Sequence, residues 1–193
     1  KMAERIDMWK PDIVLVHPCK VFQAPAVLFF LHCPTVYYAQ ETLREVYEPF
    51  FSRYFFELPK IKKVFEYVKR YIRAYVDMHA VRNAVQIYAN SKHTQSLVFH
   101  TYHRASRVVY PGVDLAIFHP FTRTKKKRQL LFVGKKTSDN GYELAQVLED
   151  HGFFIQYITT KNAKFRYTDK ELAHLYAQSL ATLCFGVDER FGL

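Results

Sequence analysis

Short apolar runs rich in Val, Ile and Leu alternate with helix-type segments along the chain, and this alternation restricts the fold more than any other feature. An uninterrupted apolar run predicts a parallel strand that is buried on both faces. Strands are therefore expected at residues 12–16, 35–39, 85–89, 107–110, 129–133, 153–159 and 181–185, and helices at 21–31, 59–79, 91–102, 141–150 and 169–178. This order predicts an α/β fold built on parallel sheets.

The alternation of strands and helices stops at residues 112–128 and then begins again. This stretch has no clear periodicity, and it ends in the basic run Lys125-Lys126-Lys127-Arg128. We therefore expect two Rossmann-like domains, one at residues 1–119 and one at residues 120–193. The chain opens with residues that resemble the end of a helix, and it stops at Gly192 and Leu193, where a helix should begin. Both domains are therefore expected to be incomplete in this chain.

The composition favours a folded protein with anionic partners. Hydrophobic residues make up 49% of the chain, which supplies a core and argues against disorder. The formal charge of +10 favours nucleotide diphosphates, acidic lipid headgroups or nucleic acid as partners, and charge alone does not choose among them. Cys19, Cys33 and Cys184 lack metal-ligand spacing, so we expect a reduced, cytoplasmic protein without a metal site. We expect neither a membrane span nor a secretory signal.

The carboxyl ends of the predicted strands are the first places to look for a binding site, because ligands of parallel α/β sheets bind there. Gly134, Lys135 and Lys136 follow the strand at 129–133. Two cations and the N–H groups of a loop suit a diphosphate, while the alternative is a solvated basic turn. Gln40 and Glu41 stand in the corresponding place after the strand at 35–39.

Several motifs occur in a fixed order along the chain. They are Tyr110-Pro111-Gly112-Val113-Asp114, Phe118-His119-Pro120, Leu131-Phe132-Val133-Gly134, and Glu189 with Phe191-Gly192-Leu193. In this order they resemble the family-4 glycosyltransferases, which are retaining enzymes of the GT-B fold. The resemblance implies two Rossmann-like domains and a nucleoside-diphosphate sugar as the donor substrate, with no further cofactor and no metal. The acceptor would be a hydroxyl of a glycan, a lipid or a small molecule.

The resemblance also implies roles for residues of the second domain. Glu189 matches the glutamate that contacts the transferred sugar, and Phe191, Gly192 and Leu193 would open a helix whose N–H groups face the donor. Lys135 stands where the family has an Arg that grips the diphosphate, so it keeps the charge and loses the bidentate geometry.

Two further departures from the family pattern concern the donor and the sugar. Asn140 and Gly141 stand where the family has a Lys-Gly pair, so the charge of that Lys is lost, and Lys136 is the residue that would compensate. Gln40, beside Glu41, stands where relatives place a His that touches the donor sugar. Gln40 can replace that His as a hydrogen-bonding group, although not as an acid or base.

A basic, aromatic helix is predicted at residues 59–79. Apolar residues recur at three- and four-residue spacing on one face, and six cations lie on the other. The apolar residues are Ile61, Val64, Phe65, Val68, Ile72, Tyr75 and Val76, and the cations are Lys60, Lys62, Lys63, Lys69, Arg70 and Arg73. Packing of the apolar face into the core is one interpretation. The other is a peripheral helix that lies against anionic lipid on the inner face of a membrane.

Two other classes of function compete with the glycosyltransferase. One is a degenerate glycosyltransferase homologue that folds without turnover, which Asn140 favours. The other is a non-catalytic basic α/β module that holds an anionic surface or nucleic acid through residues 60–73 and 125–128. These basic residues are not part of a recognised nucleic-acid motif, so nucleic acid is not the expected partner.

Overall fold

The computed structural model describes residues 1–48, 58–121, 124–137, 140–159 and 167–185. The chain divides into two compact units, Lys1–Pro111 and Gly112–Leu193. The domain boundary expected at residue 119 therefore falls inside the second unit. Both units combine helices with parallel strands, so the α/β class predicted from the sequence is confirmed.

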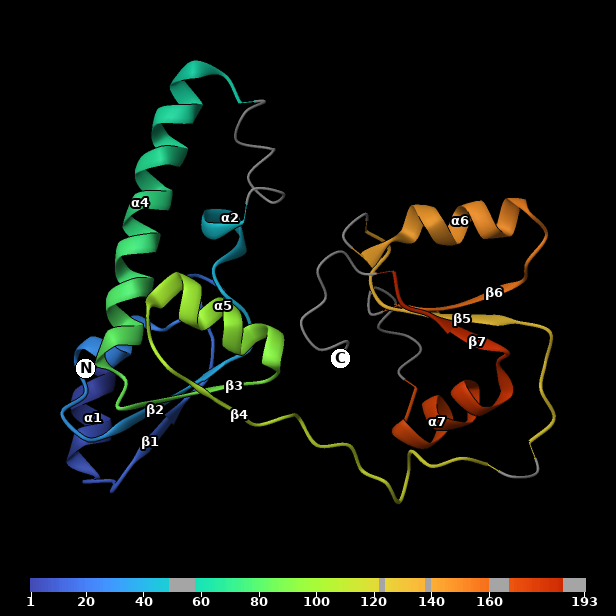
Figure 1. Cartoon of the computed structure of the whole chain (residues 1–193), viewed down its shortest axis with the longest axis horizontal. Helices are drawn as coiled ribbons and strands as arrows, with labels where there is room; N and C mark the ends of the chain where they lie inside the picture. Colours follow the sequence, from blue (N-terminus) through green and yellow to red (C-terminus); the bar gives the residue numbers. More distant parts are fainter. Residues whose placement is uncertain (49–57, 122–123, 138–139, 160–166, 186–193) are drawn as a thin grey trace. The chain divides into compact units, whose positions relative to one another are not determined.

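The first unit is built on a sheet of four parallel strands in the order β1-β2-β3-β4 (Figure 1). The strands are β1 (Val14–Val16), β2 (Thr35–Ala39), β3 (Gln86–Ala89) and β4 (Arg107–Val108). In the central pair, Tyr37 lies opposite Ile87 and Ala39 lies opposite Ala89, and all four residues are buried. Apolar side chains of β2 and β3 thus form the centre of this unit's core.

Helices cover the sheet of the first unit. They are α1 (Met2–Met8), the short 3-10 helix η1 (Ala26–Phe29), α2 (Arg44–Tyr47), α4 (Lys60–Asn83) and α5 (Lys92–Tyr102). α5 begins as the sequence predicts, because the Ser91 side chain accepts a hydrogen bond from the Thr94 N–H and so caps the helix. None of the helices among the described residues is both long enough and apolar enough to cross a membrane.

The prediction of a helix at residues 21–31 is wrong, since only the single turn η1 forms there. Two backbone hydrogen bonds join Cys19 and Gln23, with N···O distances of 2.9 and 3.0 Å, and they close a tight loop before the turn. Gln23 has a positive φ of 54°, and Ala24 and Pro25 follow it. Proline lacks an N–H and disfavours helical geometry in the residue before it, so the loop prevents an earlier helix start.

The second unit has a sheet of three parallel strands in the order β6-β5-β7 (Figure 1). The strands are β5 (Leu130–Val133), β6 (Ile155–Ile158) and β7 (Ala181–Leu183), and the helices are α6 (Tyr142–Asp150) and α7 (Asp169–Gln178). Phe132, Ala145 and Ile155 form the buried core between β5, β6 and α6. α7 starts with a capping box, in which Thr168 and Glu171 exchange side-chain and backbone hydrogen bonds.

Candidate functional site

The predicted diphosphate loop begins at the carboxyl end of β5, the central strand of the second unit. The Gly134 N–H donates to the Ile158 carbonyl at 3.0 Å and so continues the pairing of β5 with β6 by one residue. Lys135 and Lys136 follow, and both are exposed. The structure therefore places two cations at the sheet edge where ligands of parallel α/β folds bind.

The loop between β5 and α6 is held by Thr137. The Thr137 carbonyl accepts from the backbone N–H groups of Asn140 and Tyr142, at 3.1 and 3.3 Å. The Asn140 side-chain amide donates to Thr137 Oγ1 at 2.8 Å. Asn140 therefore stabilises the loop through Thr137. The glycosyltransferases that the motifs resemble have a lysine at the position of Asn140. The sequence carries no motif that singles out Thr137.

Gly141 joins the start of α6 to the end of β7. It caps α6 in a left-handed conformation, with φ of +70°. A Cβ at this position would lie 2.2 Å from Phe185 Cβ and 2.9 Å from the Phe185 carbonyl oxygen. Only glycine fits such an approach without movement of the neighbour. The loop after β5 and the residue that follows β7 by two positions therefore share one edge of the sheet.

The two lysines of the loop have different surroundings. The Lys136 ammonium lies 4.3 Å from the ring centroid of Tyr157 and 5.2 Å from that of Tyr142, which are cation–π distances. The Lys135 ammonium has no hydrogen bond or ion pair with any residue that the structure describes. Lys135 is therefore the freer cation for an anionic ligand, whereas the two tyrosines position Lys136. No sequence pattern links Tyr157 to this loop.

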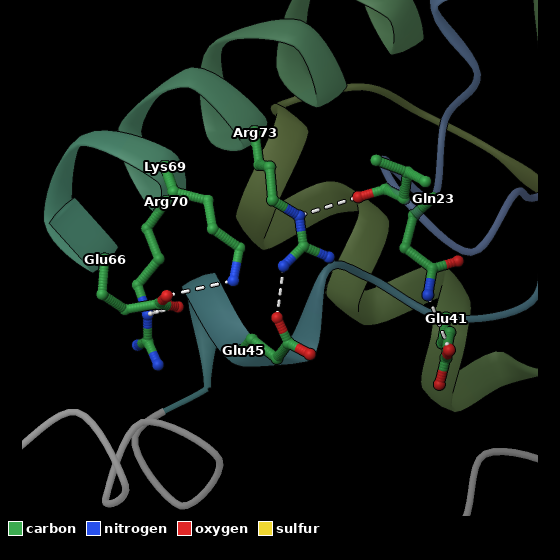
Figure 2. Close-up of polar contacts among 8 residues, drawn as sticks. Gln23, Glu41, Glu45, Glu66, Lys69, Arg70 and Arg73 are labelled. Carbon is green, nitrogen blue, oxygen red and sulfur yellow. Dashed lines mark hydrogen bonds and ion pairs between the residues drawn. The ribbon is translucent and has the colours of Figure 1, made fainter. Parts of the chain in front are cut away.

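Gln40 and Glu41 lie at the carboxyl end of β2, in the first unit. The Gln23 side-chain amide donates to Glu41 Oε1 at 2.7 Å (Figure 2). Arg44 Nε lies 3.4 Å from Glu41 Oε2. The Gln40 carbonyl accepts from the Thr94 hydroxyl at 3.2 Å, while its own side chain is exposed. Glu41 is thus held by its neighbours, and Gln40 has the more accessible side chain of the two.

Asn90 adds a polar group to the same edge of the first sheet. It follows β3, and its backbone N–H donates to the Ala39 carbonyl at 3.1 Å, so it lies beside the end of β2. Its side chain is only 3% exposed, and its Oδ1 has no hydrogen-bond partner among the described residues. An acceptor in this position can receive a hydrogen bond from a ligand hydroxyl.

The family-like motif at Phe118-His119-Pro120 packs on α7. The rings of Phe118 and Tyr176 meet edge to face, with 6.5 Å between their centroids, and the ring centroids of Phe121 and His174 are 4.7 Å apart. A cavity of about 480 Å³ lies among the side chains of this contact. The motif therefore has a structural role here as a docked segment at the start of the second unit.

The remaining predicted site residues, Glu189, Phe191, Gly192 and Leu193, lie outside the described residues. Within the described ranges, no group of three His, Cys, Asp or Glu side chains is placed to hold a metal ion. No protein-family model matches the chain, and no curated protein matches it. The strand-end geometry and the order of the sequence motifs are therefore the features of the chain that bear on its function.

Proposed function

We propose that this chain belongs to a retaining glycosyltransferase of the GT-B type, which transfers a sugar from a nucleoside-diphosphate sugar to a hydroxyl of a glycan, lipid or small molecule. One observation carries the proposal: Gly141, which ends the loop that begins with Gly134, Lys135 and Lys136, contacts Phe185. This contact joins the cationic loop after β5 to Phe185, which precedes Glu189 by four residues in the sequence. The resemblance assigns these two segments to the diphosphate and to the sugar of a single donor.

The chemistry expected of this edge is stabilisation of charge. As the bond from the sugar to the diphosphate breaks, negative charge grows on the leaving diphosphate. Lys135 and the N–H groups of the loop would stabilise that charge, and Lys136 would add to it from its position over Tyr157. Glu189 would orient the sugar through hydrogen bonds to its hydroxyls. Lysine charge replaces the bidentate arginine of the family, so donor affinity should depend strongly on Lys135.

Donor binding tests the proposal directly. Calorimetry of the full-length protein against UDP-, GDP- and ADP-sugars should show binding of at least one donor. Lys135→Ala should then weaken that binding by about 1.5 to 3 kcal/mol, the range for a hydrogen bond to a charged group. Lys125→Ala removes the same charge at another exposed lysine and should leave binding nearly unchanged. Absence of heat and of thermal shift with every donor at millimolar concentration would refute the proposal.

A degenerate glycosyltransferase homologue without turnover is the second candidate. Asn140 provides no cation, and its side-chain amide donates a hydrogen bond to Thr137. Such a protein would bind a donor and release no nucleoside diphosphate. Measuring nucleoside diphosphate release with the donor that binds, in the presence of sugar and lipid acceptors, separates the two candidates. Release that depends on Lys135 supports the enzyme, whereas binding without release supports the degenerate homologue.

A further inference from the structure

Four charged side chains of the helix α4 face the rest of the first unit. The side chains of Glu66, Arg70 and Arg73 are 20%, 15% and 12% exposed, and Asp77 is fully buried. These residues repeat at spacings of three and four, so they form one stripe of the helix. The periodicity of α4 suggests that its apolar face packs into the core. The structure differs, because the stripe that carries both acids of the helix faces inward.

The opposite stripe of α4 is apolar and exposed. We call it the outward stripe, and its members are Ile61, Phe65, Val68, Ile72 and Tyr75, which are 49% to 84% exposed. At 100° per residue these five positions fall within an arc of about 80°, and at 1.5 Å per residue they extend over about 21 Å. Figure 1 shows that the N-terminal end of α4, which carries Ile61 and Phe65, extends well beyond the sheet. A continuous apolar surface of this length indicates an interaction site.

Polar contacts fix the rotation of the helix. Arg73 is ion-paired with Glu45 of α2, and its Nε donates to the Val21 carbonyl at 2.7 Å (Figure 2). Glu66 accepts from Lys69 and Arg70 at 3.0 and 3.2 Å. Desolvation raises the pKa of Glu66, and these two cations outweigh it and leave the pKa below its ordinary value. Turning the outward stripe inward would break the contacts of Arg73 and expose the carboxylate of Asp77.

A groove adjoins the outward stripe within the first unit. It has a volume of about 590 Å³. Three members of the stripe, Phe65, Val68 and Ile72, form one wall, and Val21 and Phe22 of the loop before η1 lie among the other lining residues. Lys20 and Lys69 also line it, together with Arg73 and Glu45, which are ion-paired with each other. The groove therefore extends the apolar surface beyond the helix and keeps positive charge at its border.

Charge identifies the kind of partner. Lys60, Lys62 and Lys69 are exposed and lie about 80° to 100° around α4 from the centre of the outward stripe, whereas the only acids of the helix, Glu66 and Asp77, face inward. A second copy paired through this stripe would bring like charges together, which disfavours association. Tyr71 lies beside the stripe and is exposed, and a tyrosine side chain suits the boundary between lipid and water.

We propose that the outward stripe of α4 docks in the surface of an anionic lipid bilayer. The apolar side chains enter the boundary of the acyl chains while Lys60, Lys62 and Lys69, which flank the stripe, contact the acidic headgroups. This proposal does not rest on the glycosyltransferase function, since every residue that carries it belongs to the first unit.

Vesicle co-sedimentation of the whole chain tests the proposal. Phosphatidylcholine–phosphatidylglycerol vesicles should bind the protein, and vesicles of phosphatidylcholine alone should bind it much less. Binding should weaken as salt shortens the screening length from about 10 Å at 0.1 M to about 3 Å at 1 M. Equal binding to both kinds of vesicle, or no binding to either, would overturn the proposal.

A matched pair of double variants locates the contact. Ile61→Glu with Phe65→Glu places two carboxylates on the outward stripe and should lower the partition coefficient by about tenfold or more. Met8→Glu with Phe99→Glu makes the same change of charge at two other exposed helical positions of the first unit. This control should retain wild-type binding. Equal loss in both double variants would mean that net charge alone determines binding, which contradicts docking through the stripe.

A fluorescent reporter keeps the test independent of those variants. Trp9 is the only tryptophan, so Phe65→Trp in a Trp9→Phe background places the single indole on the stripe. Its emission should shift to the blue with anionic vesicles and remain unshifted with neutral ones. Sedimentation velocity without vesicles supplies the last comparison. A dimer that the two glutamates dissociate would show that a second copy covers the stripe, and it would overturn the proposal.

Discussion

The two ends of α4 follow the same helical periodicity and differ in what they bury. At the C-terminal end, Asp77, Ala80 and Val81 are fully buried, and this end packs against η1 and α5. At the N-terminal end, Ile61 and Phe65 are 84% and 81% exposed. Small residues allow close approach at one end, whereas large apolar residues at the other end face solvent. Periodicity therefore predicts which residues share a face, and the polar contacts decide which face turns inward.

Asp77 is the residue that fixes this choice. Its carboxylate accepts from the Ala24 N–H at 2.8 Å and from the Tyr102 hydroxyl at 2.7 Å. These bonds tie α4 to the loop before η1 and to α5. Desolvation raises the pKa of Asp77 to about 6, and the two hydrogen bonds lower it only in part. The same burial, with the charge of Asp77 next to it, raises the pKa of Tyr102, which therefore remains a donor.

The largest effect is expected from Asp77→Ala. It leaves the Ala24 N–H and the Tyr102 hydroxyl buried without an acceptor, at about 1 to 3 kcal/mol each, so the first unit should lose roughly 4 kcal/mol at pH 5. Hydrogen exchange of the β2 and β3 amides measures this loss unit by unit. Asp77→Asn is the matched control, because its amide oxygen keeps the bond from Ala24. Equal protection of all three proteins would show that Asp77 does not anchor the helix.

The pH dependence of stability should give the next largest effect. The pKa of Asp77 is about 6 in the folded protein and 3.8 for an ordinary aspartate. The stabilisation by protonated Asp77 is therefore complete below pH 4 and is lost as pH rises towards 6. The difference between the two pKa values corresponds to about 3 kcal/mol in the free energy of unfolding. The stability of the wild type relative to Asp77→Asn should therefore fall between pH 4 and 6 and stay level above pH 7. A constant difference across this range would mean that Asp77 titrates normally.

Some of this architecture is predictable from the sequence for a clear physical reason. The strand at 35–39 and the helix at 169–178 match the structure because an apolar run and a capping pattern are local signals. The absence of a helix at 21–31 depends on Gln23 and Pro25 within a loop closed by backbone pairing. The residues there are mostly apolar, and no local pattern in the sequence predicts the positive φ of Gln23.

The candidate site shows the same division between local and tertiary signals. Gly134, Lys135 and Lys136 are predictable because they directly follow an apolar strand. The contact of Gly141 with Phe185 joins residues that are distant in sequence, so no local pattern indicates it. The position of Lys136 over Tyr157 is likewise a tertiary contact. The outward orientation of the apolar stripe of α4 is the largest departure, since a helical period alone favours burial of that stripe.

The smallest effect is expected at the exposed end of α4. Phe65→Ser removes a side chain that is 81% exposed and replaces it with a residue of similar helix propensity. The stability of the first unit should change by no more than about 0.5 kcal/mol, the usual range for a surface substitution. Hydrogen exchange of β2 and β3 compares this variant with Asp77→Ala under identical conditions. A loss of about 2 kcal/mol or more, as expected for truncating a buried phenylalanine, would show that the outward stripe is covered within the folded chain. A loss within the predicted range would mean that the apolar side chains of this end contribute little to the fold and are available to a partner.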